Sequence, residues 1–239
     1  MHTKASLISD LRSLGIQPED TLLVHSSMKS IGPVEGGADT VLDAFMEYLG
    51  PKGLFVMPTL TYAAVNAEHP RFDVRATPTT CGILPQLFWQ RPGVIRSLHP
   101  THSVAAFGRD ARAFTAGHEH SDTPAPKGSP WWRLLERHAK ILFIGTPGVS
   151  CNTFCHGVDE WTGHTEMVNP VPQQLEIIDY DGNILPYSLH RHCVPRNAYY
   201  GTLEEVFRRN GTLTQGHFGD APCWLLTCDG IADTLGVKR

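Results

Sequence analysis

One histidine precedes two acidic residues at helical spacing in the segment 151–160, CNTFCHGVDE. Asp159 and Glu160 follow His156 at distances of three and four residues. Residues at these separations share one face of a helix, so a carboxylate could orient and polarise the imidazole. A polarised imidazole is the minimum equipment for general-base chemistry. The segment follows an apolar run, 141–144, that is typical of a buried strand.

Three other interpretations use the same residues. On spacing alone, an ordinary helix with solvated acids is favoured, and Asn152 or Thr153 would be its N-cap. Cys155 could be a nucleophile with a distant histidine, although nothing nearby in the sequence would activate it. A zinc site would draw its ligands from Cys151, Cys155, His156, His164, His192 and Cys193. We expect no metal, because the usual Cys-x-x-Cys or His-x-x-x-His partner is missing.

A histidine and two hydroxyl groups follow the apolar run 21–24. If that run is a strand of an α/β sheet, then His25, Ser26 and Ser27 lie at its carboxyl end, where such folds bind ligands. A second polar group, 99–103 (HPTHS), holds two histidines and two hydroxyls in five residues. A functional role and a structural role are equally compatible with it.

A pair of glycines, Gly36 and Gly37, precedes the predicted helix 38–49. Paired glycines let a ligand approach the backbone, and the free N–H groups of a helix start attract anions. A plain tight turn is the more common explanation of an isolated pair. The spacing matches neither the GxxxxGK[ST] loop nor the GxGxxG fingerprint, which disfavours nucleotide hydrolysis and nicotinamide chemistry.

The apolar segments predict an α/β fold with a mixed central sheet flanked by helices. Helical spacing predicts helices at 3–14, 38–49 and 82–89. Short apolar runs predict strands at 21–24, 53–57, 104–108, 141–144, 175–178 and 224–227. The order strand, helix, strand over 21–57 indicates a right-handed crossover and a parallel pair. Long loops are expected at 59–80 and 115–130.

The last third of the chain indicates antiparallel strands. The turn residues 181–183 (DGN), after the run 175–178, predict a hairpin. Thr202 and Glu205 have the spacing of a capping box. We predict a single domain over 1–239, with a small C-terminal subregion from about residue 170.

Composition excludes several classes of protein. The chain has 239 residues, 41% of them hydrophobic, and a formal net charge of -4. This charge offers no basic field for nucleic acid, and the scattered basic residues argue against a membrane surface. No run approaches the ~18 apolar residues of a membrane span, and no signal peptide is visible. We therefore expect a cytoplasmic protein whose six cysteines are reduced and mostly buried.

Several segments, taken in order, resemble the aminoglycoside 3-N-acetyltransferases, antibiotic-acetylating enzymes whose fold differs from that of the commoner acetyltransferase superfamily. The matching segments are 23–27 with Gly32, Gly36 and Gly37, then 53–59, 91–100 with Ser103, 128–130, 144–145 and 152–156. No single one is decisive, but the ordered set is specific and spans roughly residues 5–200. The resemblance implies a three-layer α/β fold.

The resemblance also implies acetyl-coenzyme A as co-substrate and a small-molecule amine as acceptor, namely the 3-amino group of an aminoglycoside. By position, the residues that approach coenzyme A are Ser26, Ser27, Gly36 and Gly37, joined by Ser103. The neutral amine would attack the acetyl carbonyl directly, without an acyl-enzyme.

The family's general base corresponds to His156, and His25 is a second candidate close to the chemistry. The family's usual partner of this base is a glutamate three residues on. Asp159 stands at that position here and Glu160 follows it, so the sequence leaves open which acid orients the ring.

The acceptor and the oligomeric state are less well defined by the sequence. A polycationic acceptor needs acidic walls, and Asp73, Asp159 and Glu160 are the candidates. Two alternatives stay open: a coenzyme A binding protein with little turnover, and an acetyltransferase for a non-aminoglycoside amine. A homodimer is compatible with the sequence.

Overall fold

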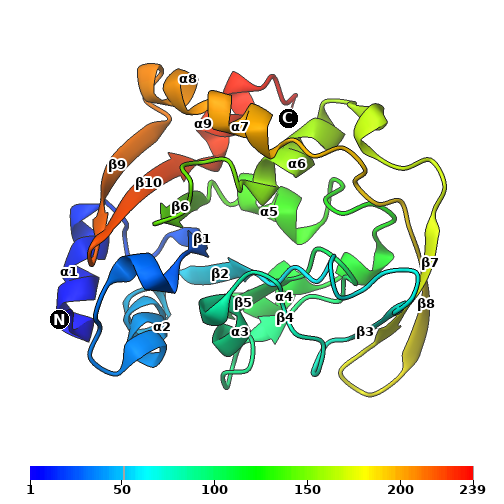
Figure 1. Ribbon diagram of the computed structural model, residues 1–239, viewed down its shortest axis with the longest axis horizontal. Helices are drawn as coiled ribbons and strands as arrows, with labels where there is room; N and C mark the ends of the chain where they lie inside the picture. Colours follow the sequence, from blue (N-terminus) through cyan, green and yellow to red (C-terminus); the bar gives the residue numbers. More distant parts are fainter. Residues whose placement is uncertain (51, 239) are drawn as a thin grey trace.

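A seven-stranded mixed sheet forms the centre of the computed structural model, which describes residues 1–50 and 52–238 (Figure 1). Its strands, in spatial order, are β4 (Ile95–Arg96), β5 (Val104–Gly108), β2 (Leu54–Pro58), β1 (Thr21–Ser26), β6 (Lys140–Ile144), β10 (Ala221–Thr227) and β9 (Leu213–Phe218). β1 is parallel to both β2 and β6, whereas every other pair is antiparallel. The predicted parallel pair and the predicted mixed sheet are both confirmed.

Helices cover both faces of this sheet. One layer contains α1 (Lys4–Ser13), α2 (Gly37–Leu49) and α3 (Ile83–Phe88). The other contains α4 (Ala111–Thr115), α5 (Pro130–Glu136), α6 (Thr153–Trp161), α7 (Asn197–Thr202), α8 (Glu204–Arg209) and α9 (Cys228–Thr234). Three short 3-10 turns, η1 (Met28–Ile31), η2 (His118–His120) and η3 (Thr165–Met167), lie in the connections. The predicted helix–sheet–helix layering is confirmed.

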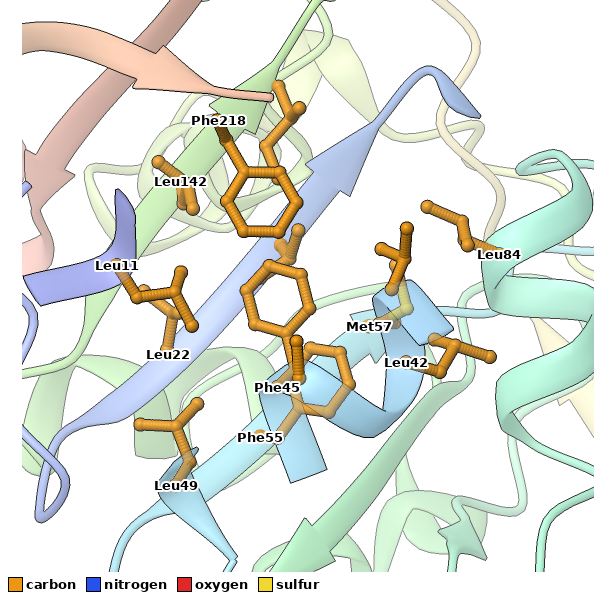
Figure 2. Close-up of a cluster of buried hydrophobic side chains, with 14 of the residues drawn as sticks. Leu11, Leu22, Leu42, Phe45, Leu49, Phe55, Met57, Leu84, Leu142 and Phe218 are labelled. Carbon is orange, nitrogen blue, oxygen red and sulfur yellow. The ribbon is translucent and has the colours of Figure 1, made fainter. Parts of the chain in front are cut away.

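The central sheet has a hydrophobic core on each face, and side chains of β1 point alternately into one and the other. Leu22 and Val24 point into the core beneath α1 and α2, whereas Leu23 packs in the opposite one. Figure 2 shows the first core, in which the Phe45 ring of α2 lies between those of Phe55 and Phe218. The ring centroids are 4.8 and 5.1 Å from Phe45, so the contacts are close-packed stacks.

A second, three-stranded sheet lies at the edge of the molecule away from α1 (Figure 1). It consists of β3 (Arg71–Asp73), parallel to β7 (Gln173–Ile178), and β8 (Ile184–Leu189), which forms the predicted hairpin with β7. β3 lies in the segment 59–80, where we expected only a loop. Three residues with one buried side chain, Phe72, are too short to show a strand period. The chain beyond 170 contributes to both sheets.

A buried guanidinium ties the small sheet to the central one. Arg96 is 1% exposed, and its Nε donates to Ser103 Oγ at 3.2 Å while its Nη2 donates to Thr59 O at 3.1 Å. Its charge lies 4.9 Å from the Phe72 ring, and its backbone exchanges hydrogen bonds with the Tyr180 hydroxyl. Burial lowers the pKa of Arg96 to about 10, so the group stays charged at neutral pH.

The predicted capping box at Thr202 is wrong. The Thr202 hydroxyl instead donates back to Tyr199 O at 2.7 Å, which closes the last turn of α7. Leu203 separates α7 from α8 and is the N-cap residue of α8. The two helices are nearly continuous, so the threonine has a helical carbonyl to bond and no free helix start to cap.

None of the helices within residues 1–50 and 52–238 is long and apolar enough to cross a membrane.

Five largely buried histidines are held uncharged. Desolvation is the main cause, and it lowers the pKa of His25 to about 4, those of His118 and His156 to about 3, and those of His99 and His102 well below 6.5. The unfolded chain binds protons on these rings below about pH 6.5, whereas the folded chain does not. Stability must therefore fall as the pH falls.

We expect the free energy of unfolding to decrease as the pH falls from 6 to 5, by at most about 1 kcal/mol per pH unit for each such histidine. Urea unfolding at pH 8, 7, 6 and 5 measures this slope. Most carboxylates titrate near pH 4 and contribute little in that window. A free energy of unfolding that is constant between pH 7 and 5 would contradict the neutral state of the rings.

Candidate active site

A cavity of about 580 Å³ opens where the parallel strands β1, β2 and β6 end. The carboxyl ends of parallel strands meet at one edge of a sheet, which places the residues that follow them around one hollow. Its walls come from the strand ends, from α6 and from the segment 192–197. The described lining residues are His25, Ser26, Pro58, Leu60, Tyr62, Thr80, Cys81, Pro85, His102, Thr146, Cys151, Thr153, His156, His192, Cys193, Val194, Pro195 and Asn197.

A hydrogen-bonded chain of three side chains leads from the cavity wall into the protein. The Tyr200 hydroxyl donates to Asp159 Oδ2 at 2.5 Å and lies 3.1 Å from His156 Nδ1. Asp159 is 5% exposed, and the Arg196 guanidinium lies 3.5 Å from it. Burial and the neighbouring carboxylate raise the pKa of Tyr200, so the hydroxyl keeps its proton.

The hydrogen bonds of this series of side chains determine the tautomer of His156. A phenol has one proton, and that of Tyr200 goes to Asp159. The tyrosine oxygen can therefore only accept from the ring, so His156 Nδ1 must carry the hydrogen. Nε2 is left with a free lone pair on a ring that lines the cavity. Desolvation, followed by the nearby His192, lowers the pKa of His156 to about 3, which keeps that lone pair unprotonated at neutral pH.

The second acid of α6 belongs to a different histidine. Glu160 Oε1 lies 2.6 Å from His192 Nε2 and accepts from Ala125 N at 3.0 Å, while Oε2 accepts from Thr123 Oγ1 at 2.6 Å. The His192 ring stacks on that of His156, with centroids 5.0 Å apart and planes 27° from parallel. Neither Asp159 nor Glu160 is hydrogen-bonded to His156: Tyr200 lies between Asp159 and the ring, and Glu160 bonds His192, which stacks on the ring.

His25 also lines the cavity. Its ring stacks on Phe143 at 4.8 Å and 5°, and its buried Nε2 has no hydrogen-bond partner among the described residues. Ser26 Oγ and both amide atoms of Asn152 are likewise buried and unpartnered within the described chain. Asn152 is the N-cap residue of α6, as expected, but its side chain does not cap the helix. These orphaned polar groups beside a cavity fit a polar ligand such as a thioester.

The other predicted coenzyme A residues lie away from the cavity lining. Ser27 donates its backbone N–H to Ile144 O at 2.9 Å and lies at the start of η1. Gly36 and Gly37 begin α2 with positive φ angles of 75° and 64°, which is consistent with a tight turn. Ser103 is fully buried in the Arg96 network.

Asp73 also lies apart from the cavity. Its carboxylate accepts from the backbone N–H of Arg75 at 2.8 Å in the turn after β3. Glu160 lines a second cavity of about 500 Å³, which includes Trp161 and His164, and Asp159 lines neither. The three acids expected to bind the acceptor are therefore not brought together.

The cysteine-based alternatives gain no support. Burial, followed by Asp159, raises the pKa of Cys155, which keeps it a thiol rather than a nucleophilic thiolate. No group of three or more His, Cys, Asp or Glu side chains within residues 1–50 and 52–238 is arranged to hold a metal ion. The expectation that the cysteines are mostly buried is wrong for Cys151 and Cys193, which are exposed at the cavity rim.

Two residues of the site, Tyr200 and His192, were not predicted as such from the sequence. Tyr200 follows His156 by 44 residues and gives no local signal. His192 appeared only as a potential zinc ligand. Cys193 was named in the same set, and both residues line the cavity.

Comparisons with known proteins agree with this architecture. The family model described as aminoglycoside 3-N-acetyltransferase matches residues 23–236. An aminoglycoside N(3)-acetyltransferase III of a Salmonella species is 38% identical over 99% of this chain and 91% of its own length. An aminoglycoside N(3)-acetyltransferase VII of Streptomyces paromomycinus is 32% identical over 77% of this chain, and the match spans 66% of that relative. Some matches, such as that to the Acinetobacter baumannii enzyme III, span only 57% of the relative.

Solved structures share the fold. The YokD protein of Bacillus subtilis has a TM-score of 0.85 and 26% identity, covering 98% of this chain and 92% of its own. A mutant of aminoglycoside acetyltransferase AAC(3)-IVa in complex with a gentamicin has a TM-score of 0.83 and 28% identity, covering 98% and 86%. The chain therefore belongs to the aminoglycoside 3-N-acetyltransferase family, as its ordered motifs predicted.

Proposed function

We propose that this protein transfers the acetyl group of acetyl-coenzyme A to an amine, with His156 as general base. The observation that carries the proposal is the hydrogen-bonded series His156–Tyr200–Asp159 at the cavity wall, from which we infer that His156 Nε2 is unprotonated. Family membership supports acetyl-coenzyme A as the donor. The names of the relatives, and a gentamicin-bound neighbour, support the 3-amino group of an aminoglycoside as an acceptor.

The reaction needs one proton acceptor at the nucleophile. The neutral amine attacks the thioester carbonyl, and His156 Nε2 takes a proton from the nitrogen as the C–N bond forms. Collapse of the tetrahedral intermediate breaks the C–S bond. The coenzyme A thiolate leaves and receives the proton from His156, so the base is restored without an acyl-enzyme.

The surrounding side chains stabilise the charge that His156 gains. Its Nδ1–H donates to Tyr200, which in turn donates to the Asp159 carboxylate. The oxyanion needs donors of its own, and the N–H of Ser27 is already bonded to Ile144. We assign this role to two unpartnered groups, the Ser26 hydroxyl of the cavity lining and the Asn152 amide, which lies between the lining residues Cys151 and Thr153.

Replacing His156 by alanine should reduce turnover by about 10²–10⁴-fold, the usual contribution of general acid–base catalysis. Thiol release from acetyl-coenzyme A with an aminoglycoside panel measures this, and calorimetry shows whether coenzyme A still binds. His120→Ala, at a side chain that is 82% exposed, is the matched control. Wild-type turnover in the purified His156 variant would eliminate this base. Binding without release in the wild-type protein would instead identify a coenzyme A binding protein.

Tyr200→Phe tests the tautomer argument. It removes the hydroxyl between His156 and Asp159 and keeps the buried ring. A hydrogen bond to a charged group contributes about 1.5–3 kcal/mol, so we expect kcat to fall about 10–100-fold with the KM for acetyl-coenzyme A unchanged. Tyr199→Phe removes the same hydroxyl from an adjacent exposed ring and should have no effect. Unchanged kcat in the Tyr200 variant would show that the bridge is dispensable.

His25→Ala distinguishes the two candidate bases. His25 has no hydrogen-bonded acid, so we expect its loss to affect KM more than kcat. If kcat fell further in this variant than in His156→Ala, the roles of the two histidines would have to be exchanged.

A further inference from the structure

We propose that the amine acceptor of this cavity carries few positive charges, so that a monoamine is accepted better than a polycationic aminoglycoside. The inference rests on the proposed acetyl transfer and narrows its acceptor.

The cavity wall offers no counter-charge to a cation. Of the described residues that line it, none is Asp or Glu. The polar ones are hydroxyl, sulfhydryl, amide and imidazole side chains, such as Thr80, Cys81 and Asn197. Much of the remaining wall is apolar, including Leu60.

Asp159 is linked to His156 through Tyr200, and its carboxylate already has two partners. Tyr200 donates to Oδ2 at 2.5 Å, and the Arg196 guanidinium lies 3.5 Å from the same carboxylate. The side chain of Asp159 is 7% exposed, which leaves it little contact with a ligand. Arg196 itself adds a positive charge next to the wall segment 194–197.

The carboxylate of Glu160 is also fully hydrogen-bonded within the protein. His192, Thr123 and the backbone N–H of Ala125 together occupy both of its oxygens, at 2.6, 2.6 and 3.0 Å. The side chain is 7% exposed and opens on the second cavity rather than the first. A cation in the first cavity would therefore meet the His192 imidazole instead of this carboxylate.

An ammonium group enclosed without a partner is costly, because it loses water and gains no counter-ion. The reacting amine escapes this cost since it must shed its proton before attack. Every further ammonium of a polycationic acceptor would keep its charge in a wall of neutral groups. The desolvation free energy therefore becomes more unfavourable with each amine beyond the first. This favours acceptors whose remaining groups are uncharged.

A series of acceptors of increasing charge tests the inference. Glucosamine, 2-deoxystreptamine and kanamycin carry one, two and several amines, and thiol release from acetyl-coenzyme A gives kcat/KM for each. We expect kcat/KM to fall at least about tenfold from glucosamine to kanamycin, mainly through KM. A value for kanamycin equal to or above that for glucosamine would overturn the inference.

A variant with a carboxylate at the cavity wall distinguishes the effect of acceptor charge on kcat/KM from the effect of acceptor size. Val194 lines the cavity and is 40% exposed, so Val194→Asp should fold and place one carboxylate at the wall. We expect it to raise the kanamycin-to-glucosamine ratio of kcat/KM about tenfold, an effect that added salt reduces. Val206→Asp adds the same charge on α8, at a residue 44% exposed, and should leave the ratio unchanged.

The outcomes are distinguishable from failure of the acetyl transfer itself. An unchanged ratio in Val194→Asp, with circular dichroism showing a folded protein, would mean that wall charge does not select the acceptor and would overturn the inference. Absence of thiol release with every amine would refute the proposed function, and this inference with it.

Discussion

The proton of the Tyr200 hydroxyl can go to only one neighbour, and it goes to Asp159. This one hydrogen bond settles three features of the site. It makes the tyrosine oxygen an acceptor, so His156 must donate from Nδ1 and keeps its lone pair on Nε2. It also stabilises a buried carboxylate, together with the Arg196 guanidinium 3.5 Å away. The direction in which His156 presents its lone pair therefore depends on a residue of α7, far along the chain.

The spacing of His156, Asp159 and Glu160 predicted a shared helix face. α6 holds all three, but only His156 lines the first cavity, Glu160 lines the second and Asp159 is buried. Helical geometry could not show that residues from other segments form hydrogen bonds with both acids. Tyr200 stands between the histidine and one carboxylate, and His192 binds the other. Both partners lie in the segment 192–200, whose position depends on tertiary contacts rather than on any local pattern. A spacing rule identifies which groups are close but not which of them bond.

Local sequence patterns also determine how much of the fold could be predicted. The strand runs and helical stripes of the first 60 residues are long enough to show their period, and β1, α2 and β2 were correctly predicted. β3 has too few residues for any period, and the capping box at Thr202 failed because a helix already preceded it. Among site residues, strand ends predicted His25 and Ser26 at the cavity, whereas Gly36 and Ser103 matched by motif and lie elsewhere.

A cavity that lowers the pKa of its base to about 3 looks unsuited to proton transfer, but the comparison that matters is between base and substrate. Transfer from the attacking nitrogen, which becomes cationic as the C–N bond forms, to His156 moves one positive charge within the same cavity, so desolvation penalises both cations alike. Acidic walls would stabilise the bound ammonium and oppose its deprotonation. Neutral walls destabilise it, while the Tyr200–Asp159 pair stabilises the imidazolium alone. The absence of acids from the described cavity lining thus favours the nucleophilic, uncharged amine.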